Sequence, residues 1–278
     1  MRSREKRAKG LRRAVFYVFV TGVVVVWAFP VLWVILGSFK NDRDIISQSL
    51  KVLFSPTVKN YVKIFLTHDF ARFLLNSTLV AGGTTVVVLA SAFPASYSLS
   101  RYNTGGDAMS LVILVTRISP PAAVLMPFFI IFKETNLLNS LIALVLVNIS
   151  LNLSFALLLL RSFLDEIPIS IEESARLEGA TLFQTMRLLL FPLARSGIIT
   201  TSIFTFILTW NEYLFAMVLC SSNRVKTLPV AAGDFITAYA VEWGPIFASG
   251  TLILLPILVM TFFVQKNIIK GITAGAVK

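Results

Sequence analysis

The sequence is poor in the residues that build metal sites and covalent cross-links. Its 278 residues include one cysteine, Cys220, and one histidine, His68. A single cysteine excludes an intrachain disulfide, and the pair is too few for the Cys/His clusters of structural zinc or iron–sulfur sites. A membrane-embedded enzyme would need a constellation such as H-E-x-x-H, or a nucleophile with its base, which one histidine cannot supply. We therefore predict no catalytic residue and no metal site.

Charged residues are also scarce. They make up 14% of the chain and hydrophobic residues 56%, whereas soluble domains are about 25% charged and about 45–50% apolar. The apolar surplus predicts that lipid is a large part of the solvent. The net charge of +11 suits basic loops that orient a membrane protein. No basic stripe interleaved with aromatics lies in a polar segment, so nucleic-acid binding is not expected.

Six apolar runs are long enough to cross a bilayer, which takes about 20 residues of helix. Backbone in lipid must satisfy its own hydrogen bonds, so each is expected to be helical and the fold all-α. The six predicted spans are Ala14–Gly37, Phe73–Ser100, Ala108–Phe132, Ser140–Leu160, Gly197–Cys220 and Ile246–Gln265.

The distribution of basic residues predicts the orientation. With the N-terminus in the cytoplasm, 15 of the 25 Lys and Arg residues fall on the cytoplasmic side and nine on the other, which favours an N-in/C-in arrangement. The chain then divides into a basic tail (1–13), a transmembrane domain (14–266) and a C-terminal tail (267–278). The longest cytoplasmic loop spans residues 161–196.

This loop carries two helix signals. Ser170 with Glu173 has the spacing of a capping box, so a helix should begin near Ile171 and end at Gly179. Glu172 and Arg176 are four residues apart, as in a stabilising ion pair. Thr181 and Gln184 repeat the capping pattern, and a second helix should end near Pro192. On these residues alone, the loop suits a protein partner and the membrane surface equally.

Polar groups inside predicted spans are costly and are functional candidates by default. For a solute path they are Arg117, Asn148, Asn152, Asn211 and Glu212, with Trp210 or Tyr97 as an aromatic stacking face. The alternative is hydrogen bonding between helices of the bundle.

The loop also resembles a known motif. The segment Glu173–Ala180, followed by Phe191-Pro192-Leu193, resembles the EAA loop of ABC importer permeases. It departs from that pattern at four positions, Ser174, Glu178, Phe191 and Ser196. Further segments resemble the carbohydrate-type, maltose-transporter-like branch: Thr209–Phe215, Lys270–Lys278, Ser38–Lys40, Asn60-Tyr61 and Asn76-Ser77.

The resemblance implies a sugar-importing permease of a prokaryotic inner membrane. Its partners would be a second, different permease, two copies of an ATP-binding subunit and an extracytoplasmic solute-binding protein that meets outer loops including Leu228–Val230. The chain lacks the G-x-x-x-x-G-K-[ST] phosphate loop, so ATP and Mg would be bound by the partner subunits.

The resemblance also assigns residues. The residues that dock to the ATPase would be Glu173, Ser174, Ala175, Glu178, Gly179 and Ala180. The C-terminal tail would make a second contact with the ATPase through Gly271, Thr273 and Gly275. An ion-coupled secondary transporter or a channel is the alternative function. It would need carboxylates in the spans, where Glu212 is the one acid clearly placed.

Overall fold

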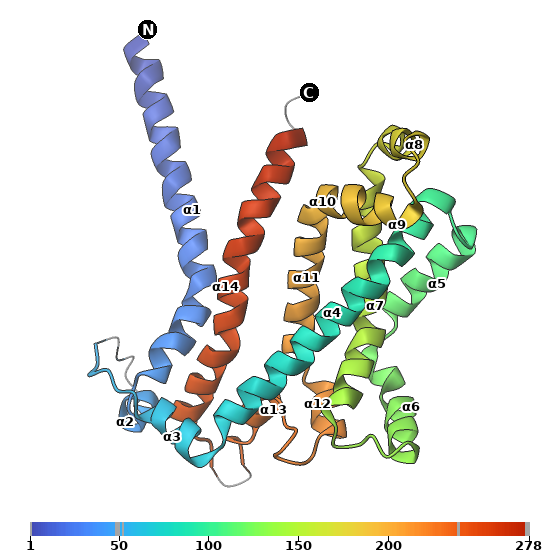
Figure 1. The fold of residues 1–278 in the computed structure, drawn as a ribbon. Helices are drawn as coiled ribbons and strands as arrows, with labels where there is room; N and C mark the ends of the chain where they lie inside the picture. Colours follow the sequence, from blue (N-terminus) through green and yellow to red (C-terminus); the bar gives the residue numbers. More distant parts are fainter. Residues whose placement is uncertain (1, 48–50, 52, 238–239, 276–278) are drawn as a thin grey trace. The chain divides into compact units, whose positions relative to one another are not determined.

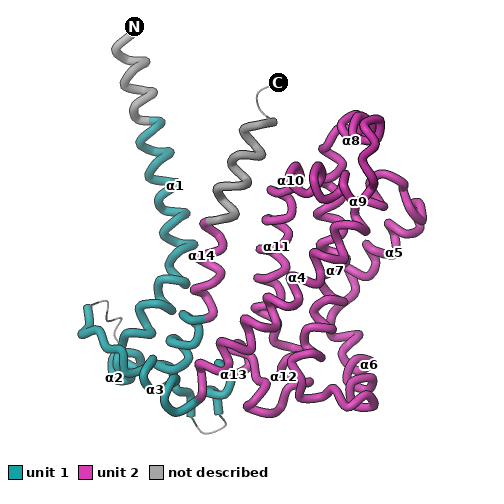
Figure 2. The backbone as a smooth tube through the Cα atoms, in the orientation of Figure 1, with its two compact units in different colours: residues 1–68, 232–252 teal, residues 69–231, 253–278 magenta. Residues whose placement is uncertain are grey.

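The computed structural model describes the backbone of residues 2–47, 51, 53–237 and 240–275, and side chains within 12–262 of these ranges. Within these residues the regular structure is helical (Figure 1). The chain forms two compact units (Figure 2): Met1–His68 with Ala232–Leu252, and Asp69–Ala231 with Ile253–Lys278. The predicted all-α fold is confirmed.

The first unit is organised by the side chain of Asn60. It contains α1 (Arg2–Ser38), α2 (Asp42–Ile46), α3 (Lys59–Thr67) and the start of α14 (Trp243–Gly275). The Asn60 amide donates to the carbonyl oxygens of Ser38 and Lys40, both at 2.9 Å, so it satisfies carbonyls that the end of α1 leaves free. Gly244 lies so close that a Cβ would sit 2.3 Å from Asn60 Oδ1.

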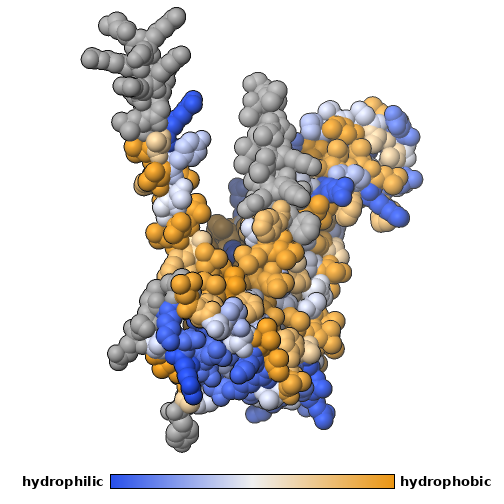
Figure 3. Space-filling view, turned by 90° about the vertical axis from the view of Figure 1, so that its left-hand side faces the viewer, coloured by the Kyte–Doolittle hydropathy of each residue, from blue (hydrophilic) through white to orange (hydrophobic). Residues whose placement is uncertain are grey.

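α1 carries an exposed apolar surface between Val15 and Leu36. Trp27 is 79% exposed and Val18 74% exposed. Figure 3 shows hydrophobic side chains along this helix and hydrophilic ones gathered at the lower end of the same face. Such a surface suits lipid or another apolar partner, as the predicted span Ala14–Gly37 requires. The helix already begins at Arg2, so the predicted basic tail is helical in its backbone.

The second unit is built around α4 (Phe70–Tyr102), which packs along α7 (Leu141–Asp165) and α11 (Arg195–Trp210). Val88 and Ala92 of α4 meet Ala156 and Leu160 of α7 in one buried cluster. Val80 begins a second cluster that includes residues of α6 (Pro121–Glu134) and α12 (Leu214–Leu219). These contacts leave the ends of α4 and α7 close to the loop at 161–196.

The third predicted span is broken. Residues Ala108–Phe132 fall in α5 (Gly106–Ile118) and α6, which meet at 90°. Pro120 forces the preceding Ser119 out of the helical region, to φ −58° and ψ 131°. Pro121 then begins α6 at a position where its missing N–H costs nothing. The predicted span is therefore helical but is broken into two helices at these prolines.

The fifth predicted span, Gly197–Cys220, is also interrupted. α11 ends at Trp210 and α12 begins at Leu214. The Asn211 side chain donates to the Ile207 carbonyl at 2.8 Å, and the Glu212 carboxylate accepts from the amides of Phe215 and Ala216 at 2.7 and 3.0 Å. These two polar side chains satisfy the backbone groups that the break exposes. A continuous helix here was a wrong prediction.

Four helices are long and apolar enough to cross a membrane: α1, α4, α7 and α14, counted over described residues. Two bent pairs raise the number to six if each is one span. One is α5 with α6. The other joins Leu182–Leu193 to α11 at 77°. The structure thus supports four to six spans.

Candidate functional site

The loop at 161–196 folds as two helical segments joined at Gly179. The first is α8 (Ile169–Leu177). The second runs through α9 (Leu182–Gln184), the π-helical turn η1 (Thr185–Leu190) and α10 (Phe191–Leu193). Gly179 has φ +86°, a left-handed conformation that favours glycine at the end of a helix. A Cβ there would meet nothing within 4 Å, so backbone conformation and not crowding within the chain sets this requirement.

One predicted capping box exists and the other does not. Thr181 Oγ1 accepts from the Gln184 amide at 3.4 Å, and Gln184 Oε1 accepts from the Thr181 amide at 2.8 Å. At the first helix, α8 begins at Ile169 behind Pro168, whose φ is −59° and ψ 130°. Ser170 is therefore already inside the helix, where its carbonyl accepts from Ser174 Oγ at 2.9 Å. The Ser170–Glu173 box was a wrong prediction because Pro168 starts the helix earlier.

The residues predicted to dock an ATPase lie on an accessible surface. Glu173, Ser174 and Glu178 are exposed, and Ala175 and Ala180 are partly so. A shallow groove of about 360 Å³ is lined by Ala175, Glu178, Gly179, Ala180, Gln184, Thr185, Leu188 and Leu189. Four of the six predicted residues therefore share one concave surface. Leu177 and Leu188 nearby are 90% and 70% exposed.

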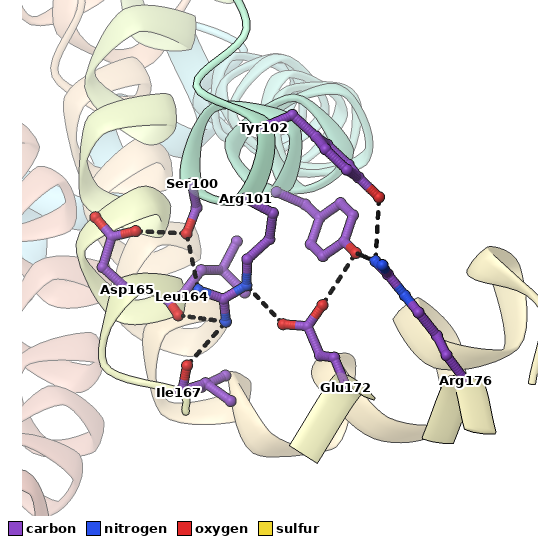
Figure 4. Close-up of polar contacts among 9 residues, drawn as sticks. Ser100, Arg101, Tyr102, Leu164, Asp165, Ile167, Glu172 and Arg176 are labelled. Carbon is purple, nitrogen blue, oxygen red and sulfur yellow. Dashed lines mark hydrogen bonds and ion pairs between the residues drawn. The ribbon is translucent and has the colours of Figure 1, made fainter. Parts of the chain in front are cut away.

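Glu172 is the buried acid of this loop, and sequence reasoning missed it. Within α8, which is described throughout, it is the one buried residue. Its Oε1 accepts from Arg101 Nε at 2.6 Å and its Oε2 from the Tyr97 hydroxyl at 3.0 Å (Figure 4). Both partners belong to the end of α4. A buried carboxylate is tolerated when a charged partner and hydrogen bonds satisfy it in this way.

Arg176 extends the same contact by one helical turn. Its guanidinium donates to the hydroxyls of Tyr97 and Tyr102, each at 3.1 Å. The hydrogen bond to Tyr97 raises the pKa of Arg176 above its usual value. The predicted Glu172–Arg176 ion pair is wrong, since both side chains turn to α4 instead. Tyr97 is 2% exposed in this cluster, so its predicted role as a stacking face for solute is wrong as well.

Arg101 connects a third element. Its Nη2 donates to the carbonyls of Leu164 and Ile167, at 3.0 and 2.9 Å, where α7 ends and its last carbonyls lack helical partners. Ser100 beside it hydrogen-bonds Asp165. Arg101 thus holds the end of α7 and the buried side of α8 to α4.

The sequence that forms this site also matches a known protein family. The profile of the family described as "Binding-protein-dependent transport system inner membrane component" matches residues 87–274, a range that includes α4 from its middle, the whole loop and α11. The chain belongs to this family. It is an inner-membrane ABC transporter permease, a transport component and not itself catalytic.

Relatives and solved structures agree with this assignment. The permease is 32% identical over 96% of its length to the probable ABC transporter permease protein y4oR of Sinorhizobium fredii, covering 96% of that protein. It is 32% identical to the trehalose transport system permease protein SugB of Mycobacterium tuberculosis, over 97% and 99% of the two chains. Its fold resembles a chain of a bacterial ABC transporter that imports the polysaccharide alginate, with a TM-score of 0.78, 20% identity and coverage of 94% and 97%.

The candidate solute-path residues of the permease have partners within the chain, and Asn152 also donates to Thr209 Oγ1, beside Trp210, at 3.4 Å. Asn148 and Asn152 are buried, and each donates to the carbonyl four residues earlier on α7 at 2.9 Å. Trp210 is 2% exposed, and its indole N–H donates to the Ile253 carbonyl at 3.1 Å. Arg117 lies 5.1 Å from the ring centre of Phe155. Asn211 and Glu212 lie at the helix break, so all six have partners inside the permease.

The predicted tail contact lies at the end of the described region. Gly271, Thr273 and Gly275 lie beyond residue 262, so these positions are outside the residues whose side chains the structure describes.

At the end of α4 away from Arg101, the Asn76 amide donates to the carbonyls of Arg224 and Lys226, at 3.1 and 2.9 Å, and Ser77 Oγ accepts from the Leu228 amide at 2.8 Å. The Asn76-Ser77 pair thereby positions the loop that leads into α13 (Leu228–Gly233).

Proposed function

We propose that this permease imports a sugar or sugar-like solute and forms the translocation path with a second, different permease. Two copies of an ATP-binding subunit supply ATP and Mg and drive alternating access, and an extracytoplasmic binding protein delivers the solute. Six spans with both termini in the cytoplasm complete the proposal. The trehalose permease among its relatives supports the solute class.

One observation carries the proposal, the shape of the coupling loop, residues 161–196. α8 turns one side to α4 through Glu172 and presents Glu173 and Ser174 to solvent, and Glu178 directly after the helix is exposed as well. The groove at the Gly179 junction is open beside them. A helix that is anchored on one face and free on the other suits a docking element, because a partner can load it without unfolding it. The predicted docking residues Ala175, Gly179 and Ala180 supply the small side chains that let a partner approach closely.

The test is co-purification of the tagged permease from its native membrane in mild detergent, with the bound proteins identified by mass. The unmodified permease should recover an ATP-binding subunit and a second permease. Gly179→Asp should lose the ATP-binding subunit and keep the second permease, because it places a charged side chain in the groove. Recovery of the permease alone would contradict the proposal and favour a secondary transporter.

A further inference from the structure

α8 is attached to α4 along one face over two successive turns. Glu172 contacts Arg101 and Tyr97, and Arg176 contacts Tyr97 and Tyr102. Residues four apart share a helix face, so α8 presents this pair to α4 as one surface. α4 and α8 are separated by 71 residues between Arg101 and Glu172, and their contact is therefore a tertiary one that chain connectivity does not impose.

Arg101 makes this attachment a three-way junction (Figure 4). The guanidinium contacts Glu172 of α8 through Nε and the end of α7 through Nη2. Its planar fork of donors can bond a carboxylate and carbonyl oxygens in fixed directions, which a lysine ammonium cannot do in the same way. The position therefore calls for arginine by geometry as well as by charge.

The junction is also buried. The Arg101 and Glu172 side chains are 6% and 2% exposed. Separating a buried ion pair leaves an uncompensated charge in a poorly solvated place, whereas an exposed pair can be replaced by water contacts. α8 should accordingly stay on α4 while the loop is displaced.

We propose that Arg101 is a positioning residue that fixes α8 to the ends of α4 and α7, so that displacement of the coupling loop moves α4 directly. The inference rests on the proposed function, since it takes ATPase docking at the loop as given. It adds a route through α4, in addition to the chain connections to α7 and α11. Because α4 packs along both of these helices, the three would move as one body.

A distance measurement tests the junction in the intact transporter. Spin labels are placed on α8 at Leu177→Cys and on α4 at Val86→Cys, positions that are 90% and 67% exposed, while the native Cys220 is buried. The complex is measured by dipolar electron spectroscopy, without nucleotide and trapped with ATP and vanadate. The label distance should be the same in both states and should broaden on trapping in Arg101→Ala. A distance that shifts on trapping without the Arg101 change would overturn the proposal.

Transport supplies a second readout, solute uptake per ATP hydrolysed in proteoliposomes. Glu172→Gln keeps the side-chain size and removes the charge, and Glu166→Gln is the matched control at the exposed C-cap of α7. Glu172→Gln should retain the ATPase subunit and lose at least about fivefold in uptake per ATP, the lower range of a typical coupling between sites.

The outcomes separate the two proposals. Equal uptake per ATP in Glu172→Gln and the control would refute the role of the junction. Loss of the ATPase subunit from Glu172→Gln, but not from the control, would show that the pair shapes only the docking surface, and would also refute it. Absence of an ATPase subunit from the unmodified transporter would instead refute docking at the loop.

Discussion

Two neighbouring glutamates of α8 have opposite surroundings. Glu172 is buried and paired with Arg101, whereas Glu173 is exposed. In the sequence they are indistinguishable, because the phase of the helix on α4 decides which one is buried. The resemblance to the EAA loop, and not the local pattern, assigned Glu173 to ATPase docking, and its side chain is exposed in the structure.

Their replacement by alanine should separate folding from docking. Glu172→Ala leaves Arg101 buried without its partner, which costs about 3–5 kcal/mol in comparable pairs, so the unfolding temperature of the purified permease should fall clearly. Glu173→Ala should stay within about 0.5 kcal/mol of the unmodified stability, as exposed substitutions usually do. Equal thermal stability of the two variants would show that the Arg101–Glu172 pair does not hold the loop.

Substitutions at Gly179 can test whether glycine is needed there for its backbone conformation or for the space that it leaves to a partner. Its φ of +86° should cost a β-carbon residue about 1–2 kcal/mol, and asparagine tolerates the left-handed region better than alanine does. Gly179→Asn should therefore fold more stably than Gly179→Ala, as measured by thermal unfolding. If both variants are as stable as the unmodified permease, the turn is not conformationally strained, and glycine there serves only the approach of a partner.

At the scale of elements, the sequence predicted the parts of the loop whose signals are local. Gly179 ends the first helix, and Thr181 with Gln184 caps the second. The predicted start of α8 was wrong because the helix begins directly after Pro168, one residue before Ser170. The burial of Glu172 could not be predicted, because Arg101 lies 71 residues earlier and no local pattern links them. The broken third and fifth spans had local signals, Pro120-Pro121 and Asn211-Glu212, which average hydrophobicity conceals.

The cap of α9 yields a prediction at this scale. Thr181→Ala removes the hydroxyl that accepts from the Gln184 amide, at a cost of about 1 kcal/mol. Hydrogen exchange of the amides in 182–184 should become faster, while Thr181→Ser, which keeps the hydroxyl, should exchange like the unmodified permease. Unchanged exchange in Thr181→Ala would mean that packing, and not the cap, holds this segment.

For the whole molecule, the proposed topology places the coupling loop inside the cell and the segment before α3 outside. Leu177 and Leu53 are 90% and 94% exposed, and Cys220 is buried, so single cysteines at these two positions can report sidedness. In intact cells, a membrane-impermeant maleimide should label Leu53→Cys and should label Leu177→Cys only after the membrane is opened. Labelling of Leu177→Cys in intact cells would show that the orientation is the opposite of the proposed one.

The proposed function depends most on the exposed face of α8 being the surface that receives an ATP-binding subunit. A photo-crosslinking amino acid in place of Ser174, which is exposed on that helix, tests this directly in the native membrane, with the same substitution at Leu53 as the control. We expect a covalent adduct between position 174 and an ATP-binding subunit, and none between position 53 and that subunit. Adducts from position 174 to lipid or to the permease itself, with no ATP-binding subunit among them, would contradict it.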